Sequence, residues 1–261
     1  TLPVPVARSY FADYSSYTAN YILITERIPF GVEPVERAYL KGWDHLIPEV
    51  EEHYRVLARS LAKLAGAHKA GRLGDDVETL FPFARSARDF APIDDVAGRV
   101  DRLIDFVVRV APQLFVEGAD DSRFLGRLRD DLIFGLQRKD AIVAYLHRDV
   151  DYVSFCHPNL NPDNAWFWRD ERGQLQAGLL DWGGAGQMSI AQALSGMLMM
   201  VEPERHLAMV RTVLETFIAG YAADGGPQID FEELHLQYKA SLFSTALGLI
   251  VGMIVDLLPQ F

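Results

Sequence analysis

A short stretch of β character, residues 152–180, interrupts a chain that otherwise reads as helical from about residue 49 onward. Three runs in this stretch are strand-like: 152–156, 165–168 and 175–180. The polar segment 169–173 is typical of a turn and would join the last two runs into a hairpin. Because the β elements are grouped and do not alternate with helices, their order predicts an α+β fold.

The first 30 residues also have β character, with strand-like runs at Arg8 to Phe11 and Asn20 to Arg27 around a polar turn. Apolar residues at helical spacing predict helices over 49–70, 94–110, about 121–148, 189–201, 204–223 and 230–257. Segment 75–92 has no clear period and is interpreted as connecting structure. Asp94 and either Asp120 or Asp121 are candidate helix N-caps.

The chain has 261 residues, enough for one large domain or two lobes with a sizeable core. Its net charge of −11 argues against a nucleic-acid partner, which needs a basic face. An acidic surface attracts a cationic substrate, but it also simply confers solubility, and both explanations stay open.

Three features of the sequence bear on the expected cellular compartment. The single cysteine, Cys156, excludes an internal disulfide and fits a reducing cytoplasm. We find no signal peptide at the start. The longest uncharged run, residues 240–255, is shorter than the roughly 20 residues that a spanning helix needs. We therefore expect a cytoplasmic protein with no membrane partner.

The first run of the β stretch leads into the polar segment His157-Pro-Asn-Leu-Asn-Pro-Asp-Asn164. Asp181 follows Asn164 by 17 residues, at the end of the predicted hairpin. Amide and carboxylate oxygens suit Mg²⁺, and the hairpin brings both residues to one edge. Taken singly, His157 also reads as a buried structural histidine, Asn164 as a turn residue and Asp181 as a turn or capping aspartate.

This segment resembles the catalytic loop of kinases, which has His, any residue, Asp, four residues and then Asn. His157 and Asn164 match at the family's spacing, and Asn159 stands where the family has its catalytic aspartate. The segment from Tyr21 to Gly31 is similar to the last strand of a kinase's small lobe and the hinge after it. On its own, that segment reads equally well as a strand that ends in a Pro-Gly turn.

The long spacing between the hinge-like segment and the loop resembles the aminoglycoside phosphotransferase and choline kinase family of small-molecule kinases. This resemblance implies a protein kinase-like fold. Residues 1–30 would be the end of a small β lobe and the hinge, and residues 31–261 a mainly helical lobe. The family's glycine-rich loop and strand lysine would precede Thr1, so we expect the natural chain to extend upstream by about 80–100 residues.

The resemblance also implies an activity: transfer of the γ-phosphate of ATP or GTP to a hydroxyl of a small molecule, with Mg²⁺. His157 would support the loop and Asn159 would orient the acceptor hydroxyl. Asn164 and Asp181 would bind the metal. In the hinge-like segment, backbone groups of Glu26 and Ile28 would bind the nucleotide base.

Asn159 changes what this chemistry predicts. An asparagine amide can orient a hydroxyl but cannot accept its proton near neutral pH. General base catalysis contributes about 10²–10⁴-fold, whereas positioning and metal electrostatics carry most of phosphoryl transfer. The sequence therefore favours either a slowed phosphotransferase or a pseudokinase-like module that binds nucleotide or metabolite without transfer. Asp163 is not expected to replace the missing aspartate, and neither acceptor nor oligomeric state is identified.

Overall fold

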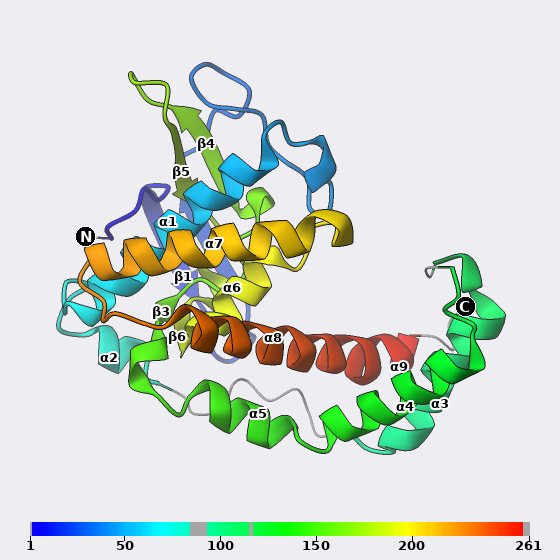
Figure 1. The fold of residues 1–261 in the computed structure, drawn as a ribbon. Coiled ribbons are helices and arrows are strands. Elements are labelled where there is room, and N and C mark those ends of the chain that lie inside the picture. The colour runs from blue at the N-terminus through cyan, green and yellow to red at the C-terminus, as the bar shows by residue number, and fades with distance from the viewer. Residues whose placement is uncertain (1, 84–92, 115–116, 258–261) are drawn as a thin grey trace. The chain divides into compact units, whose positions relative to one another are not determined.

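The computed structural model describes residues 2–83, 93–114 and 117–257. Residue contacts divide the chain into two units, Thr1–Phe83 with Val150–His235 and Ala84–Asp149 with Leu236–Phe261. Helices are combined with small antiparallel sheets, which confirms the predicted α+β class (Figure 1). These two units do not test the predicted boundary at residue 30, between the end of a small β lobe and a helical lobe, which stays a prediction.

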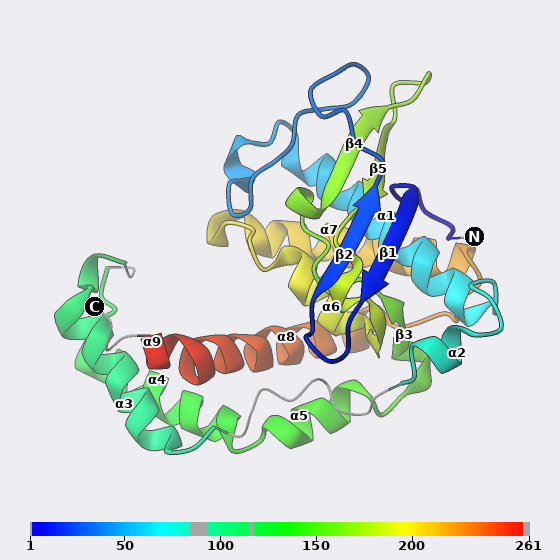
Figure 2. The ribbon, with the colours of Figure 1, turned by 180° about the vertical axis from the view of Figure 1, so that it is seen from behind.

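In its described part, the first unit contains three antiparallel pairs of strands (Figure 2). The pairs are β1 (Ser9–Tyr14) with β2 (Tyr21–Thr25), β3 (Val153–Cys156) with β6 (Gly186–Ser189), and β4 (Ala165–Arg169) with β5 (Leu175–Leu179). Strand β3 is buried along its whole length, whereas β1 and β2 are exposed on both faces. A parallel bridge between Val6 and Leu179 ties the N-terminal segment to β5.

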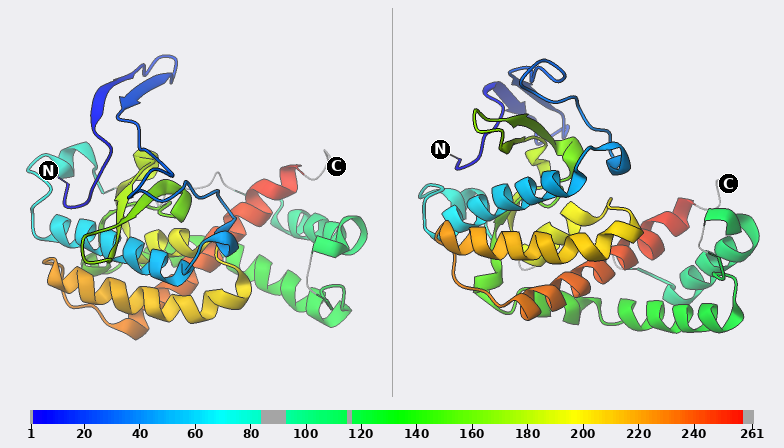
Figure 3. Two further views of the ribbon diagram at one scale, coloured as in Figure 1. Left: turned by 90° about the horizontal axis from the view of Figure 1, so that it is seen from above. Right: turned by 45° about the horizontal axis from the view of Figure 1, so that its top comes forward.

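Two long helices of the first unit, α1 (Val50–Lys69) and α7 (Pro203–Ala223), run side by side (Figure 3). Their facing sides are fully buried and include Tyr54, Leu57, Leu61, Leu64, Phe217 and Tyr221. The helices approach closely at Gly220, where an added Cβ would lie 2.8 Å from the Cβ of Ala62. Strand β3 packs on α1 and on α6 (Ile190–Leu198), so the segment that follows β3 starts from a fixed point.

The second unit is helical in its described part. It contains α3 (Val96–Asp105), α4 (Ser122–Leu136), α5 (Lys139–Leu146), most of α8 (Phe231–Leu247) and α9 (Val255–Leu257), with wider π turns at Phe106–Val110 and Gly248–Ile254. Its core gathers Val100, Leu103, Val107, Leu132, Leu247 and Val251. None of the helices in the described ranges has the length and apolar character that crossing a bilayer requires.

Several predicted elements need correction. The predicted helix 121–148 ends at Leu136, and α5 starts again at Lys139. Strand β6 was not predicted; it pairs with β3 directly before α6. Strand β1 continues to Tyr14, into the expected turn.

The caps and the connecting segment differ in part as well. Asp121 caps α4 as expected, by accepting a hydrogen bond from the Phe124 N–H, but α3 is capped by Asp95 and not by Asp94. The described part of segment 75–92 contains the short helix α2 (Val77–Leu80), and residues 84–92 lie outside the described ranges.

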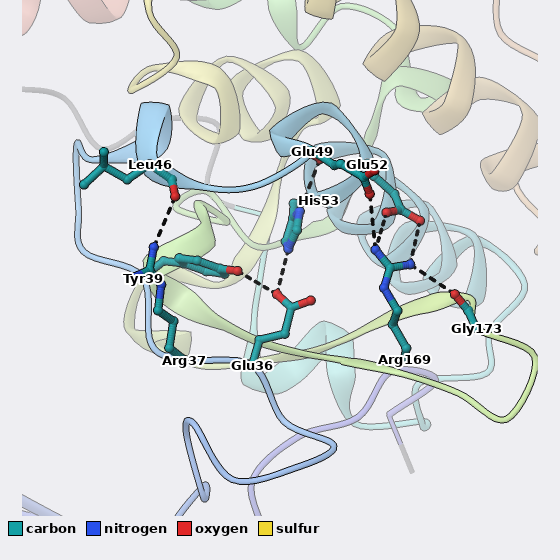
Figure 4. A network of polar contacts seen from close by, with 9 residues as sticks. All are labelled: Glu36, Arg37, Tyr39, Leu46, Glu49, Glu52, His53, Arg169 and Gly173. Carbon is teal, nitrogen blue, oxygen red and sulfur yellow. Dashed lines mark hydrogen bonds and ion pairs between the residues drawn. The ribbon is translucent and has the colours of Figure 1, made fainter.

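A polar network fastens the segment between β2 and α1 to the rest of the first unit (Figure 4). The Glu36 carboxylate accepts hydrogen bonds from the Tyr39 hydroxyl at 2.7 Å and from His53 Nε2 at 2.9 Å. The backbone N–H of Glu36 donates to the Phe167 carbonyl of β4 at 2.8 Å. Glu36 therefore connects this segment to both α1 and the β4–β5 hairpin.

We expect the free energy of unfolding to fall as the pH drops through the carboxyl range, in part because of Glu36. Burial alone would raise the pKa of Glu36, but the hydrogen bonds from His53 and Tyr39 outweigh it and lower the pKa below 4.5. A lowered pKa stabilises the fold above the unfolded value, and this contribution is lost as pH falls through the folded value. Glu36→Gln should cost about 1 kcal/mol at neutral pH and flatten the acid limb of a denaturation series. The exposed neighbour Glu33→Gln should change neither.

Candidate active site

His157 follows β3 directly and is fully buried. Its Nε2–H donates to the Leu180 carbonyl at 2.8 Å, and its Nδ1 accepts from the Asn159 backbone N–H at 3.3 Å. Burial lowers the pKa of His157, which outweighs the opposing effects of the Leu180 carbonyl and the Asp181 charge. A neutral imidazole in a single tautomer thus joins the loop after β3 to the residue before Asp181.

Asn164 closes the loop immediately before β4. Ala165 pairs with Leu179 at this end of the hairpin, and the Leu180 N–H donates to the Asn164 carbonyl at 2.8 Å. The hairpin register therefore brings Asn164 and Asp181 to the same end, as the sequence predicted. The Asn164 side-chain nitrogen donates to the Asn159 carbonyl at 2.7 Å, which fixes the orientation of its amide.

Asp181 lies at the end of this hairpin in the left-handed region, with φ of 56°. Non-glycine residues adopt this region at a cost, and aspartate and asparagine tolerate it better than most. Its side chain is exposed and forms no ion pair or hydrogen bond within the described ranges. The carboxylate is therefore available for a ligand.

The donor atoms suit a magnesium ion that also takes oxygens from a bound substrate. Asn164 uses its amide nitrogen within the loop, which leaves the amide oxygen free for a ligand, and Asp181 adds a carboxylate. Magnesium is commonly held by one or two protein oxygen ligands together with substrate phosphates and water. The described ranges contain no cluster of three or more acidic, histidine or cysteine side chains that would form an all-protein metal site.

The side chain of Asn159 contacts the side chain of Asn161 at 2.6 Å. Asn161 is buried, and its amide nitrogen is satisfied when it donates to the carbonyls of Met197 at 2.8 Å and Gly196 at 3.1 Å. In that orientation the Asn161 amide oxygen faces the Asn159 Oδ1 position, so a hydrogen bond between the two requires that the Asn159 amide is turned as well and donates through its nitrogen. The Asn159 amide oxygen then points away from Asn161 and remains available to accept a hydrogen bond.

The loop also depends on Gly196 in α6. A Cβ added at Gly196 would collide with the carbonyl oxygen of Pro158. Gly196→Ala must therefore push the loop away from α6, and we expect a destabilisation of about 1–3 kcal/mol. Thermal denaturation would measure this effect. Gly186→Ala, where nothing lies within 4 Å of the added Cβ, is the matched control.

A second set of predicted residues lines a pocket of about 660 Å³ in the first unit. The lining residues are Thr25, Glu26, Arg27, Ile28, Pro29, Phe30, Val32 and Leu180. The Glu26 N–H donates to the Arg8 carbonyl, and the Ile28 carbonyl accepts from the Phe30 N–H. Within the described ranges, the Glu26 carbonyl and the Ile28 N–H have no backbone partner. An unpaired acceptor, the Glu26 carbonyl, and an unpaired donor, the Ile28 N–H, thus belong to residues two positions apart that both line the pocket.

Leu180 connects the two sets of residues. It lines the pocket, and its backbone carbonyl and N–H bind His157 and Asn164. Sequence reasoning did not single out Leu180, nor Asn161 or Gly196, because backbone contacts and close approaches depend on the tertiary arrangement. For Asn161 the sequence offered one signal, a polar residue between the apolar neighbours Leu160 and Pro162. The structure shows that this polar side chain is buried.

Comparison with known proteins gives matches at the level of structure alone. No protein-family model and no curated protein matches the sequence. Aminoglycoside 2'-phosphotransferase-IIIa, solved with GDP, is 16% identical with a TM-score of 0.48, over 99% of this chain and 71% of that one. Aminoglycoside phosphotransferase APH(3'')-Id from Streptomyces rimosus is 16% identical with a TM-score of 0.46, over 94% of this chain and 75% of that one. Plasmodium vivax ethanolamine kinase is 13% identical with a TM-score of 0.45, over 94% of this chain and 61% of that one.

The three solved structures named above are two aminoglycoside phosphotransferases and an ethanolamine kinase. At these identities the function of the chain has to be argued from its own residues.

Proposed function

We propose that this chain binds a nucleoside triphosphate and transfers its γ-phosphate to a hydroxyl of a small molecule. The observation that carries this proposal is the position of Leu180, which lines the pocket and binds both His157 and Asn164 through its backbone. One residue thus joins this pocket to the loop that resembles a kinase catalytic loop. Asp181, the next residue, carries the available carboxylate.

The base of the nucleotide would lie in the pocket next to the hinge-like segment. Its volume of about 660 Å³ falls within the range of small-molecule sites. The Glu26 carbonyl can accept from the exocyclic amine of adenine while the Ile28 N–H donates to the adjacent ring nitrogen. Guanine also offers a donor beside an acceptor, so the pair of backbone groups suits ATP or GTP.

Asn164 and Asp181 would hold Mg²⁺ through an amide oxygen and a carboxylate oxygen. When bound, the ion would neutralise charge on the phosphate oxygens during transfer. His157 keeps both residues at one end of the hairpin, since it binds the carbonyl of Leu180, which also pairs with Asn164 and precedes Asp181. Asn159 would accept a hydrogen bond from the acceptor hydroxyl and orient it, but its amide cannot take the proton.

A second function is favoured by Asn159 itself. Without a base in the loop, the same pocket and metal ligands would bind a nucleotide or a metabolite without efficient transfer. Such a pseudokinase-like module would bind magnesium and nucleotide as tightly as an enzyme. The two functions therefore differ in turnover and not in binding.

Nucleotide binding at the pocket can be tested by filling the pocket. Val32 lines it and is exposed, so Val32→Trp should obstruct the base with little effect on folding. We expect at least a tenfold weaker affinity for Mg-ATP and Mg-GTP in calorimetric titration, because part of the base contact, about 1.4 kcal/mol or more, is lost. Leu40→Trp, at an equally exposed position outside this pocket, is the control. Unchanged affinity in Val32→Trp would contradict this placement of the base.

A further inference from the structure

A second pocket of the first unit lies apart from the candidate active site and has a volume of about 610 Å³. It is lined by the N-terminal segment, one face of α1, and the turn and strand β5 of the hairpin. The residues are Pro3, Val4, Pro5, Glu52, Arg55, Val56, Arg59, Ser60, Lys63 and Gly173 to Ala177. The two pockets share no lining residue.

Three cationic side chains line this pocket in a row. Arg55, Arg59 and Lys63 are four residues apart, so they project from one face of α1 over about 12 Å. All three are exposed, and none forms an ion pair or hydrogen bond within the described ranges. A row of three uncompensated cations is unexpected on a chain of net charge −11, because acidic groups are plentiful.

Glu52 is the acidic residue among the described lining residues, and its charge is already compensated. Arg169 Nη2 donates to its carboxylate at 2.8 Å and also lies 3.3 Å from Glu49 (Figure 4). The hydrogen bond from Arg169 lowers the pKa of Glu52, so the carboxylate stays ionised and paired. It therefore does not neutralise Arg55, Arg59 or Lys63.

Neutral residues that can form hydrogen bonds complete the wall. Ser60 lies one residue after Arg59, is largely buried and also lines the pocket. Gln174 and Gln176 line the pocket from the hairpin, and the Gln176 amide nitrogen also donates to the Asp170 carboxylate at 3.0 Å. Polar neutral groups of this kind can bind the oxygens of an anion between the cations without adding negative charge.

We propose that this pocket binds a small, elongated polyanion with at least three negative charges, of the oligophosphate or polycarboxylate class. The spacing of the three cations favours an extended molecule, because a compact anion reaches one or two of them. The pocket volume lies within the range of small-molecule sites. This site does not depend on the proposed phosphotransfer, since its residues are separate from the pocket next to the hinge-like segment.

The test is a calorimetric titration of the whole chain with inorganic tripolyphosphate, citrate and orthophosphate at low ionic strength. We expect tripolyphosphate or citrate to bind, and the tighter of the two identifies the chemical class. Orthophosphate should bind at least tenfold more weakly. Arg55→Gln/Arg59→Gln should weaken the tighter anion on the order of 10- to 30-fold, since one exposed ion pair contributes up to about fivefold. Added salt should weaken binding in the wild type.

The control variant is Arg123→Gln/Arg127→Gln, which removes two exposed cations at the same spacing from α4, outside both pockets. It should leave anion affinity within about twofold, because it lowers the net charge by the same amount but removes no residue that lines the pocket. Equal losses in both variants would overturn the proposal in favour of a net-charge effect. Loss of tripolyphosphate binding in Val32→Trp but not in Arg55→Gln/Arg59→Gln would overturn it too, by placing the anion at the nucleotide pocket. An oligoglutamate peptide should be titrated in the same way. If the peptide binds and neither tripolyphosphate nor citrate does, the proposal of a small-molecule ligand is overturned in favour of an acidic protein partner.

Discussion

Replacing Asn159 by aspartate is expected to raise ATP turnover by about 10²- to 10⁴-fold, the usual contribution of a general base. The backbone of Asn159 is fixed by His157 and Asn164, so a carboxylate at this position would start from the same place as the amide. Turnover of Mg-ATP by the wild type and by Asn159→Asp measures the effect. Water serves as acceptor, so no natural substrate has to be known.

The same substitution should lower stability. The carboxylate introduced by Asn159→Asp has no N–H to offer Asn161, which must then turn its amide nitrogen toward it and away from the Gly196 and Met197 carbonyls. Leaving buried acceptors unpaired costs about 1–3 kcal/mol, which thermal denaturation would detect. A gain in turnover with a lower melting temperature would support a degraded kinase site. Unchanged turnover with intact Mg-ATP binding would favour the binding module.

Asp163 provides the control for this experiment. Its charge is felt at Asp44, whose pKa is raised chiefly by burial and further by Asp163. We expect Asp163→Asn to leave the turnover of both the wild type and Asn159→Asp within about twofold, because a residue that takes no proton contributes no base catalysis. A loss of activity in Asp163→Asn alone would make Asp163 the base and contradict the role given to Asn159.

The elements that the sequence predicted well are those with a strong local pattern. Strands β4 and β5 combine apolar and aromatic residues with a polar turn, and α1 carries a continuous apolar face. The side chains of Trp166 and Trp168, two residues apart, stack at 6.2 Å as expected for one face of a strand. Asp121 caps α4 because a short acceptor before an apolar helix is a local signal.

What the sequence missed depends on partners distant in the chain. Strand β6, Gly-Gln-Met-Ser, has little β propensity and exists because β3 offers it an edge. The interruption after Leu136, at Gln137 and Arg138, contains no proline, and the nearest glycine, Gly135, still lies inside α4, so propensity does not mark where the helix stops. The contact of Asn161 with α6 and the clearance at Gly196 arise only when α6 packs against the loop. The spacing of His157 and Asn164 could be predicted from the sequence, but the residues that fix the loop against α6 could not.

Replacing Asp181 by asparagine is expected to reduce magnesium-dependent turnover on the order of 10³-fold, since a bound metal contributes several kcal/mol to phosphoryl transfer. Asparagine is the sharpest choice because it tolerates the left-handed backbone, with φ of 56°, as well as aspartate does. A change in activity then reports the lost charge and not a displaced chain. The measurement is best made in the Asn159→Asp background, where the expected turnover is high enough to follow a large decrease.

Nucleotide affinity separates this role from a purely structural one. Titration with and without Mg²⁺ should show that the ion strengthens ATP binding to the wild type but not to Asp181→Asn, because the variant keeps the pocket and loses the anionic ligand. Asp75→Asn removes an exposed carboxylate that lies outside the loop and the hairpin, and it should preserve the magnesium effect. If Mg²⁺ strengthens ATP binding to Asp181→Asn as well, Asp181 does not hold the metal. The loop from His157 to Asn164 would then need another carboxylate to act on phosphate.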